Sequence, residues 1–249
     1  MLTLFLSLVV ENDATAQRVS PQNGKPSSMI IRILSSLVLV PIALGAIWLG
    51  SPYFGALITL GGVLAATEWW RLMANVRIIN LNLFWKMFGL IYIAIPCFIL
   101  IWLRNIEPQG FQFVIWFFAV IWANDIGAYF IGKSIGGPKL APYISPNKTW
   151  AGSIGGIVLA LFISFALNQF SSIELETWGL IIACILVSIF GQLGDLLESW
   201  VKRKLGIKDS GSLIPGHGGV LDRIDAILMG APLMWLIVIV FQLGGLSWK

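Results

Sequence analysis

The sequence predicts an all-α, polytopic integral membrane protein with about seven transmembrane helices, and three observations carry this prediction. The mean hydropathy is +0.86 and 57% of the residues are hydrophobic, which is more than a water-soluble surface allows. Charged residues make up only 11% of the chain, against roughly 25% in ordinary soluble proteins. The apolar residues form continuous runs of about 20 residues, whereas a transmembrane β-barrel would show alternating segments of about ten.

Seven apolar runs are long enough to cross a bilayer as helices. They are Ile30–Leu49, Tyr53–Leu72, Leu83–Leu103, Phe111–Ile131, Trp150–Phe170, Trp178–Leu197 and Ile224–Leu243. A re-entrant run, or insertion of the apolar N-terminus, would change this count by one or two. The N-terminus lacks the basic start of a secretory signal, and the residues after it are polar with scattered Pro and Gly. We therefore expect a flexible N-terminal segment, 1–28, and a single transmembrane domain, 29–249.

The end of the second run has a composition typical of a membrane interface. It reads Glu68, Trp69, Trp70 and Arg71.

The cations as a whole predict the orientation of the helices. If the N-terminus is cytoplasmic, every Lys and Arg except Arg104 and Lys249 lies on the cytoplasmic side. Three polar regions then face the cytoplasm, 124–150, 191–198 and 199–225, where a site can use soluble nucleotides and also contact lipid headgroups.

The stretch 199–225 is the densest in charge and the best candidate for a functional site. It reads SWVKRKLGIKDSGSLIPGHGGVLDRID and contains five cations, three carboxylates, five glycines and the only histidine of the chain. Ionisable residues beside lipid are costly, so they usually mark a functional site. Cations bind phosphate, carboxylates bind divalent metals, and glycines let backbone N–H groups approach an anion.

Four carboxylates near the predicted helix ends are candidate metal ligands: Asp195, Glu198, Asp222 and Asp225. Within each pair the residues are three apart, so their side chains lie on similar faces of a helix. Gly191 and Gly194 would let another helix approach closely. Mg²⁺ typically takes one or two protein carboxylates and leaves its other positions to water and substrate phosphate. The alternative is that the carboxylates form structural ion pairs with nearby lysines.

The cations of the same stretch are candidate phosphate ligands, in particular Lys202, Arg203 and Lys208. The alternative is a positive-inside signal or attraction to anionic headgroups, and for Lys204 we favour this alternative. The loop 215–219 has glycines that allow close approach of the backbone to a phosphate. His217 in this loop can hydrogen-bond a phosphate or transfer a proton, although a lone histidine is more often a structural hydrogen-bonding residue.

A second polar stretch, NDIGAYFIGKSIGGPKLAPYISPNKT, spans 124–149. Asn124 and Asp125 interrupt an apolar helix. One interpretation is a polar contact between helices, and the other is that they line a nucleotide pocket or hold a second cation. Lys148 and Thr149 precede the fifth apolar run, where the positive end of a helix dipole favours phosphate. The sequence patterns of Walker, zinc, serine-hydrolase and Rossmann sites are absent.

The stretch 199–225 resembles the signature of the phosphatidate cytidylyltransferases, also called CDP-diglyceride synthases. The matching positions are Ser199-x-Val-Lys-Arg-x4-Lys208-Asp209-x-Gly211-x2-Ile214-Pro215-x-His217-Gly-Gly-Val-x-Asp222-Arg223-Ile224-Asp225, without a departure. So many matched positions make the resemblance highly specific. Residues 124–156 also resemble the family's second conserved stretch, with Ala151 where many members carry an acidic residue. The N-terminal third is similar to the family only in hydropathy.

The resemblance implies that CTP and phosphatidic acid react to give CDP-diacylglycerol and pyrophosphate in domain 29–249, at the cytoplasmic helix ends. It implies catalytic roles for Asp195, Asp222, Lys202, Arg203, Lys208 and Asp225. It implies Mg²⁺ on Asp195 and Asp222, with Asp225 and Glu198 as weaker ligands and room for a second cation. It extends substrate binding to Ser199, His217, Gly218, Gly219, Arg223, Asn124, Asp125, Lys133, Lys148 and Thr149.

The expected location is a bacterial inner membrane, with membrane lipid as a partner and no nucleic acid. A homodimer is compatible with the sequence, which does not fix the oligomeric state. The nearest alternative activity is a CTP-dependent lipid-alcohol kinase, in which an alcohol attacks the γ-phosphorus of CTP. Another alternative is a transporter that uses buried acids as an ion path, but this predicts polar residues across the bilayer midplane. In this sequence the charges cluster at helix ends instead.

Overall fold

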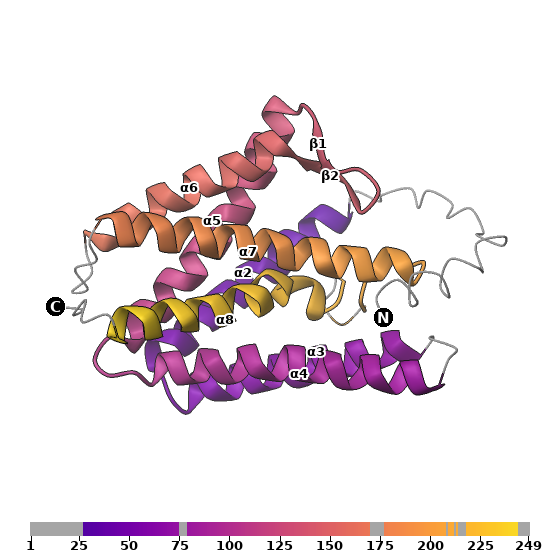
Figure 1. Ribbon diagram of the computed structural model, residues 1–249, viewed down its shortest axis with the longest axis horizontal. Coiled ribbons are helices and arrows are strands. Elements are labelled where there is room, and N and C mark those ends of the chain that lie inside the picture. The colour runs from indigo at the N-terminus through magenta and orange to yellow at the C-terminus, as the bar shows by residue number, and fades with distance from the viewer. Residues whose placement is uncertain are drawn as a thin grey trace.

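The computed structural model describes residues 27–74, 79–169, 177–207, 209–211, 213 and 218–243. In these residues the chain forms a helical bundle with one small hairpin of strands (Figure 1). The elements are α2 (Ser27–Leu49), α3 (Tyr53–Ala74), α4 (Ile79–Arg104), α5 (Gly110–Ile135), β1 (Lys139–Ala141), β2 (Ser145–Thr149), α6 (Trp150–Asn168), α7 (Thr177–Lys204) and α8 (Leu221–Leu243). Each of the seven predicted apolar runs coincides with one helix. Residues 1–26 of the expected flexible segment lie outside the described residues.

Five of the described helices are long and apolar enough to cross a membrane. They are Leu83–Arg104 in α4, Gly110–Ile135, Trp150–Asn168, Thr177–Lys204 and Leu221–Val240 in α8. In α2 the described apolar stretch is shorter, Leu37–Leu49, and α3 is not among the five. The helical, polytopic architecture expected from the hydropathy is therefore confirmed, while the count of seven spans stays a prediction.

Three antiparallel helix pairs, α3–α4, α5–α6 and α7–α8, make up most of the bundle. Their alternating direction gathers the C-terminal ends of α3, α5 and α7 with the N-terminal ends of α4, α6 and α8 (Figure 1). We call this end, together with the β1–β2 hairpin, the polar end. At the opposite end Arg104 donates to the carbonyl of Ile47 at 2.8 Å and so ties α4 to α2.

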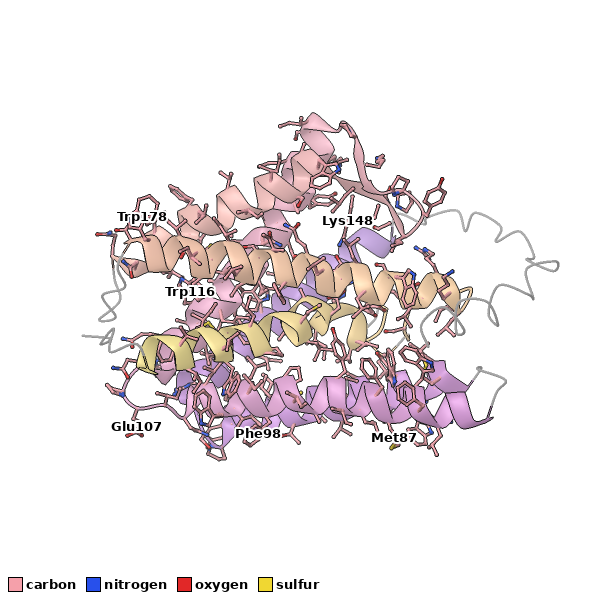
Figure 2. The ribbon with its side chains drawn as sticks, in the orientation of Figure 1. Met87, Phe98, Glu107, Trp116, Lys148 and Trp178 are labelled. Carbon is pink, nitrogen blue, oxygen red and sulfur yellow. The ribbon has the colours of Figure 1, made fainter. Side chains whose placement is uncertain are left out.

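The interior of the bundle is built around α5, whose Val114, Phe117 and Val120 are fully buried. A second buried cluster near the polar end joins α3 to α8 through Met73 and Leu221. Large apolar side chains cover the outside, and Phe98 of α4, labelled in Figure 2, is 70% exposed. Apolar side chains facing outward agree with helices that are surrounded by lipid.

Glycines allow two of the helix pairs to pack backbone against backbone. Between α5 and α6, a Cβ atom at Gly156 would lie 2.6 Å from the carbonyl oxygen of Asn124. Between α7 and α8, a Cβ at Gly194 would collide with the carbonyl oxygen of Asp225. A Cβ at Gly191 would lie 2.9 Å from Ile121, so this glycine lets α7 approach α5. The close helix approach predicted for Gly191 and Gly194 is therefore confirmed.

The β1–β2 hairpin was not predicted from the apolar pattern. Gly136, with φ +67°, ends α5 in a conformation that residues with a side chain rarely adopt. The chain then forms an antiparallel pair in which Lys139 is opposite Thr149 and Ala141 is opposite Ser145. The hairpin pairs part of the backbone of this polar connection, and it brings β2 to the polar end beside α7.

Candidate active site

The candidate site lies where the C-terminal end of α7 meets the N-terminal end of α8. Asp195, Glu198, Ser199 and Lys202 recur every three or four residues along α7 and therefore share one face of the helix. This face is directed at α8, because Lys202 contacts Asp222 near the start of that helix. The spacing of the sequence thus places acids and a lysine in the gap between two helices.

Lys202 is the central cation of this gap. Its Nζ lies 2.5 Å from Oδ1 of Asp222 and 3.3 Å from Oε1 of Glu198. The residue is only 8% exposed, so the ammonium group is held among protein atoms and its charge is offset by the two carboxylates. Lys202, one of the expected phosphate ligands, therefore forms ion pairs with two acidic side chains.

Asp222 organises the backbone in front of α8 with its second carboxylate oxygen. Oδ2 accepts hydrogen bonds from the N–H groups of Ser210 and Gly219, both at 2.9 Å, and lies 3.0 Å from Oγ of Ser210. Gly218 has φ +83°, and a Cβ there would lie 2.8 Å from this oxygen. Gly218 of the signature is thus needed so that the backbone can approach the Asp222 carboxylate.

A group of four carboxylates from three helices lies beside this pair. Asp225 interacts electrostatically with Asp195 and Glu198 of α7, and Asp125 of α5 interacts with Asp225 and Asp195. Both carboxylate oxygens of Glu198 are buried and accept no hydrogen bond, although Oε1 lies 3.3 Å from the ammonium of Lys202. Within this group the four carboxyl groups outnumber the neighbouring lysines, Lys148 and Lys202.

The donor set of this group suits a hard divalent cation, which prefers carboxylate oxygen ligands. The buried oxygens of Glu198 without a hydrogen-bond partner are the kind of atoms that such an ion would satisfy. In the part of the chain that the structure describes, however, no three His, Cys, Asp or Glu side chains are arranged around one point as metal ligands. The residue types therefore fit a cation, whereas the positions of the described side chains are not those of a complete metal site.

Lys148 connects the hairpin to the acidic group. Its ammonium forms an ion pair with Oδ2 of Asp195, and Figure 2 shows Lys148 at the polar end, where β2 meets α7. Ser199 adds a hydrogen bond of 3.3 Å from its Oγ to Oδ1 of Asp195. Thr149 has a local role, because its buried side chain accepts the N–H of Gly152 at 3.1 Å and caps α6.

The remaining predicted cations lie on the surface. Arg203 donates to the carbonyl groups of Ile144 in the hairpin and Ile207 after α7. Lys133 lies over the ring of Tyr129, with 5.8 Å between Nζ and the ring centroid, and Arg223 is exposed. Lys208 and His217 lie outside the described residues. Of the expected cations, the structure therefore brings Lys202 and Lys148 into the acidic group.

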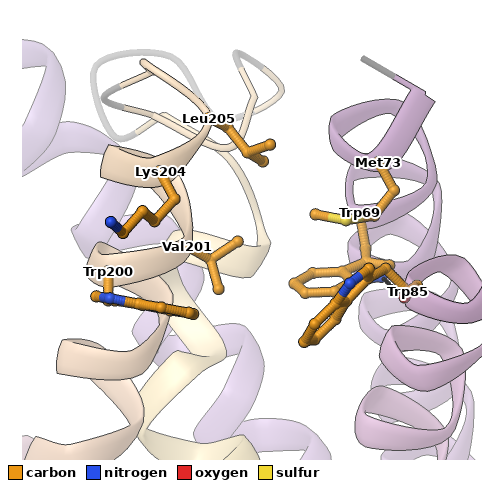
Figure 3. A pocket seen from close by; sticks show the side chains of 7 residues that line it. All are labelled: Trp69, Met73, Trp85, Trp200, Val201, Lys204 and Leu205. Atoms are coloured by element: carbon orange, nitrogen blue, oxygen red, sulfur yellow. Dashed lines mark hydrogen bonds between the residues drawn. The ribbon is translucent and has the colours of Figure 1, made fainter. Parts of the chain in front are cut away.

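Lys204 lines a small apolar pocket next to the site. Its neighbours in the pocket are Trp200, Val201 and Leu205 of α7, with Trp69, Met73 and Trp85 on the facing helices α3 and α4. Figure 3 shows these aromatic side chains facing one another across the gap between the helices. This position suits an interfacial lysine whose alkyl chain packs on apolar groups while its charge reaches the surface.

Three polar residues that the sequence analysis did not select take part in the site. Gln192 of α7 donates to Oδ1 of the buried Asn124 at 2.8 Å, which makes Asn124 a contact between helices. Ser210 joins the Asp222 network, and Glu68 of α3 accepts hydrogen bonds from the start of α8. Gln192 and Glu68 are polar groups within apolar runs, which is the signal that could have found them, whereas Ser210 lies inside the signature stretch.

The comparisons with known proteins identify the family of the chain. The sequence model of the Cytidylyltransferase family matches residues 75–241, which contain the α7–α8 site. A phosphatidate cytidylyltransferase of Brucella suis is 42% identical over 193 residues, 75% of this chain and 67% of the relative. One of Rickettsia bellii is 39% identical over 223 residues, 87% of this chain and 93% of the relative. One of Bacillus subtilis is 42% identical over 152 residues, 61% of this chain and 56% of the relative. With a matching family model and relatives of this similarity, the chain belongs to the cytidylyltransferase family.

Proposed function

We propose that the chain transfers a cytidylyl group from CTP to phosphatidic acid and so forms CDP-diacylglycerol and pyrophosphate. The proposal rests on membership of the family and on relatives named phosphatidate cytidylyltransferase. The observation that carries it is the contact between Lys202 and Asp222, two residues of the signature, beside a group of carboxylates at one end of the bundle. A site there can meet a headgroup phosphate and a water-soluble nucleotide at the same place.

In the proposed reaction an oxygen of the lipid phosphate attacks the α-phosphorus of CTP. The new phosphorus–oxygen bond forms while the bond from the α-phosphorus to the bridging oxygen of the β-phosphate breaks, and pyrophosphate leaves. We assign no general base, because a phosphate monoester is already anionic near neutral pH. Such a transfer depends on positioning and on neutralising charge more than on covalent chemistry.

Different residues of the site are assigned to positioning, to phosphate binding and to metal binding. Lys202 and Lys148 hold the carboxylates in place and offset their charge, as their ion pairs support. Arg203, Lys208, His217 and Arg223 are proposed to bind phosphate groups of the two substrates. Asp195, Asp222, Asp225 and Glu198 are the residues that would hold Mg²⁺, with a second cation beside it. Bound Mg²⁺ would supply Lewis-acid polarisation of phosphate oxygens.

We also propose that the polar end faces the cytoplasm of a bacterial cell, and that α2 and α3 complete a set of seven spans. The concentration of Lys and Arg at the polar end supports this orientation. CTP and Mg²⁺ are then available to the site directly, while phosphatidic acid reaches it from the adjacent leaflet.

The test is a label-transfer assay with purified protein in detergent, phosphatidic acid, Mg²⁺ and CTP labelled at the α-phosphate. We expect the label to move into the organic phase only when phosphatidic acid is present. We also expect a chelator to stop the transfer and added Mg²⁺ to restore it. Transfer of label from the γ-phosphate of CTP to a lipid alcohol would instead establish the kinase alternative.

A further inference from the structure

Glu68 is a buried acid far from the signature in sequence but in contact with it in space. It lies in the last turns of α3 and is 2% exposed. Its sequence context suggested only a membrane interface, and it precedes residues 75–241, which the family model matches. A carboxylate this deeply buried is costly unless its oxygens are satisfied, so its partners indicate why it is there.

The partners of Glu68 are the first backbone N–H groups of α8. Oε1 accepts the N–H of Val220 at 3.0 Å, and Oε2 accepts the N–H of Leu221 at 2.9 Å. The first N–H groups of a helix have no partner within the helix, and a negative charge near them is favoured by the helix dipole. Glu68 therefore caps α8 from another helix, 152 residues away in the sequence from Val220.

Glu68 and Asp222 are connected through Ser210. Oγ of Ser210 lies 3.1 Å from Oε2 of Glu68 and 3.0 Å from Oδ2 of Asp222, so its single hydroxyl is within donating distance of both carboxylates. Asp222 holds the N–H of Gly219, and Glu68 holds the next two N–H groups along the chain. Both acids thus accept hydrogen bonds that fix the start of α8.

The two glycines next to these contacts leave space for the Glu68 carboxylate. A Cβ at Gly211 would lie 2.6 Å from Oε1 of Glu68, and a Cβ at Gly219 would collide with both Oε2 of Glu68 and Oγ of Ser210. Both glycines belong to the signature in 199–225. Glu68 therefore lies next to the signature at two positions, Gly211 and Gly219.

We propose that Glu68 is a positioning residue for the transfer reaction, acting through Ser210 and the first turn of α8 to hold Asp222 against Lys202. The proposal rests on the proposed function. Asp222 is two residues from Val220, so a shift of the start of α8 moves its carboxylate directly. Oδ1 of Asp222 lies 2.5 Å from Nζ of Lys202, so a displacement of the start of α8 changes this contact.

The test compares Glu68→Gln with the wild type and with Met73→Ala as a matched control. Glutamine keeps the shape of Glu68 but places an N–H₂ group opposite N–H donors or the Ser210 hydroxyl. Met73 is equally buried on α3 and packs in the same apolar cluster as Leu221 at the start of α8, but it is not a hydrogen-bond acceptor for the N–H groups there. Its truncation therefore reports the effect of lost packing at the start of α8 while the Glu68 contacts are kept. Both variants are assayed as folded protein, well below their unfolding temperatures.

We expect Glu68→Gln to lower kcat by about 100-fold, the loss that a displacement of about 1 Å can cause, with KM for CTP and for phosphatidic acid unchanged within about threefold. Met73→Ala should lower the unfolding temperature while kcat stays within about threefold of the wild type. If folded Glu68→Gln keeps a wild-type kcat, or if both variants lose kcat in parallel with stability, Glu68 has no positioning role.

A second readout does not depend on activity. Hydrogen exchange, followed by mass spectrometry, is measured on a peptide that contains Val220 and Leu221. We expect the amide that faces the new N–H₂ group to exchange faster in Glu68→Gln than in the wild type and in Met73→Ala, because Val220 and Leu221 each use a different carboxylate oxygen and glutamine keeps only one. Unchanged exchange would contradict the positioning role even if the wild type does not use CTP. An inactive wild type with the expected exchange would instead contradict only the proposed function.

Discussion

Lys202 of α7 and Asp222 of α8 form an ion pair of 2.5 Å that closes the gap between the two helices at the polar end. Twenty residues of chain separate them, and the signature contains both. Because the other oxygen of Asp222 holds the N–H groups of Ser210 and Gly219, one carboxylate connects the helix pair to the backbone before α8. The ion pair with Lys202 and the conformation of the backbone before α8 therefore both depend on the carboxylate of Asp222.

Asp222→Asn is expected to reduce turnover by about 100-fold or more, because the variant loses the charge that faces Lys202. The amide keeps one oxygen for the N–H groups of Ser210 and Gly219, so the protein should remain folded in detergent. Transfer of the α-label from CTP measures turnover, and elution in size-exclusion chromatography serves as the control for folding. Full activity in the folded variant would rule out the proposed role of Asp222.

Lys202→Met is expected to lower the free energy of unfolding by about 3–5 kcal/mol, the usual cost of removing one partner from a buried ion pair. The variant leaves the carboxylates of Glu198 and Asp222 buried without their shared cation. Thermal unfolding in a single detergent measures the effect. Adding Glu198→Gln should restore part of the lost stability, and an unchanged unfolding temperature in the single variant would contradict the buried pair.

Gly194→Ala is expected to destabilise the protein by about 1–3 kcal/mol, because the new methyl group has to displace the Asp225 backbone on α8. Gly61→Ala on α3 is the matched control, since a Cβ there meets no atom within 4 Å. The control should be neutral or more stable by about 0.5–1 kcal/mol, the usual gain from replacing a helical glycine by alanine. Equal unfolding temperatures for the two variants would show that α7 and α8 are not in close backbone contact.

Lys204→Ala is expected to change turnover by no more than about twofold, as surface substitutions usually do. Lys204 lies at a pocket of apolar side chains, among Trp69 and Trp200, and no described acid pairs with it. The label-transfer assay of the variant provides the measurement. A loss of about 100-fold would mean that Lys204 binds a substrate phosphate, and that the surface role favoured from the sequence is wrong.

Hydropathy was sufficient to predict the helices. The run Leu83–Leu103 lies within α4, Ile79–Arg104, and Phe111–Ile131 lies within α5, Gly110–Ile135. These matches follow from a property of each segment by itself, because an apolar run of this length has to satisfy its backbone internally. The spacing of three between Asp195 and Glu198 likewise predicted a shared helix face.

Contacts between distant segments could not be predicted in this way. Glu68 looked like part of a membrane interface from its neighbours in the sequence, because its partners, Val220 and Leu221, lie at the start of another helix. Thr149 caps α6, a role that depends on where β2 ends and that was not predicted, while its expected contact with phosphate stays a prediction. The β1–β2 hairpin was missed since a short polar connection carries no apolar period.

The glycine contact between α5 and α6 determines which substitutions the protein can accept. A Cβ at Gly152 would lie 2.7 Å from the carbonyl oxygen of Ala128, and Gly156 is similarly close to Asn124. On the outer side of α6, Ile154, Val158 and Phe162 are exposed. Saturation mutagenesis of α6 should therefore show tolerance with the period of the helix. Almost no replacement would be accepted at the two glycines, and nearly any apolar residue would be accepted at the three outward positions.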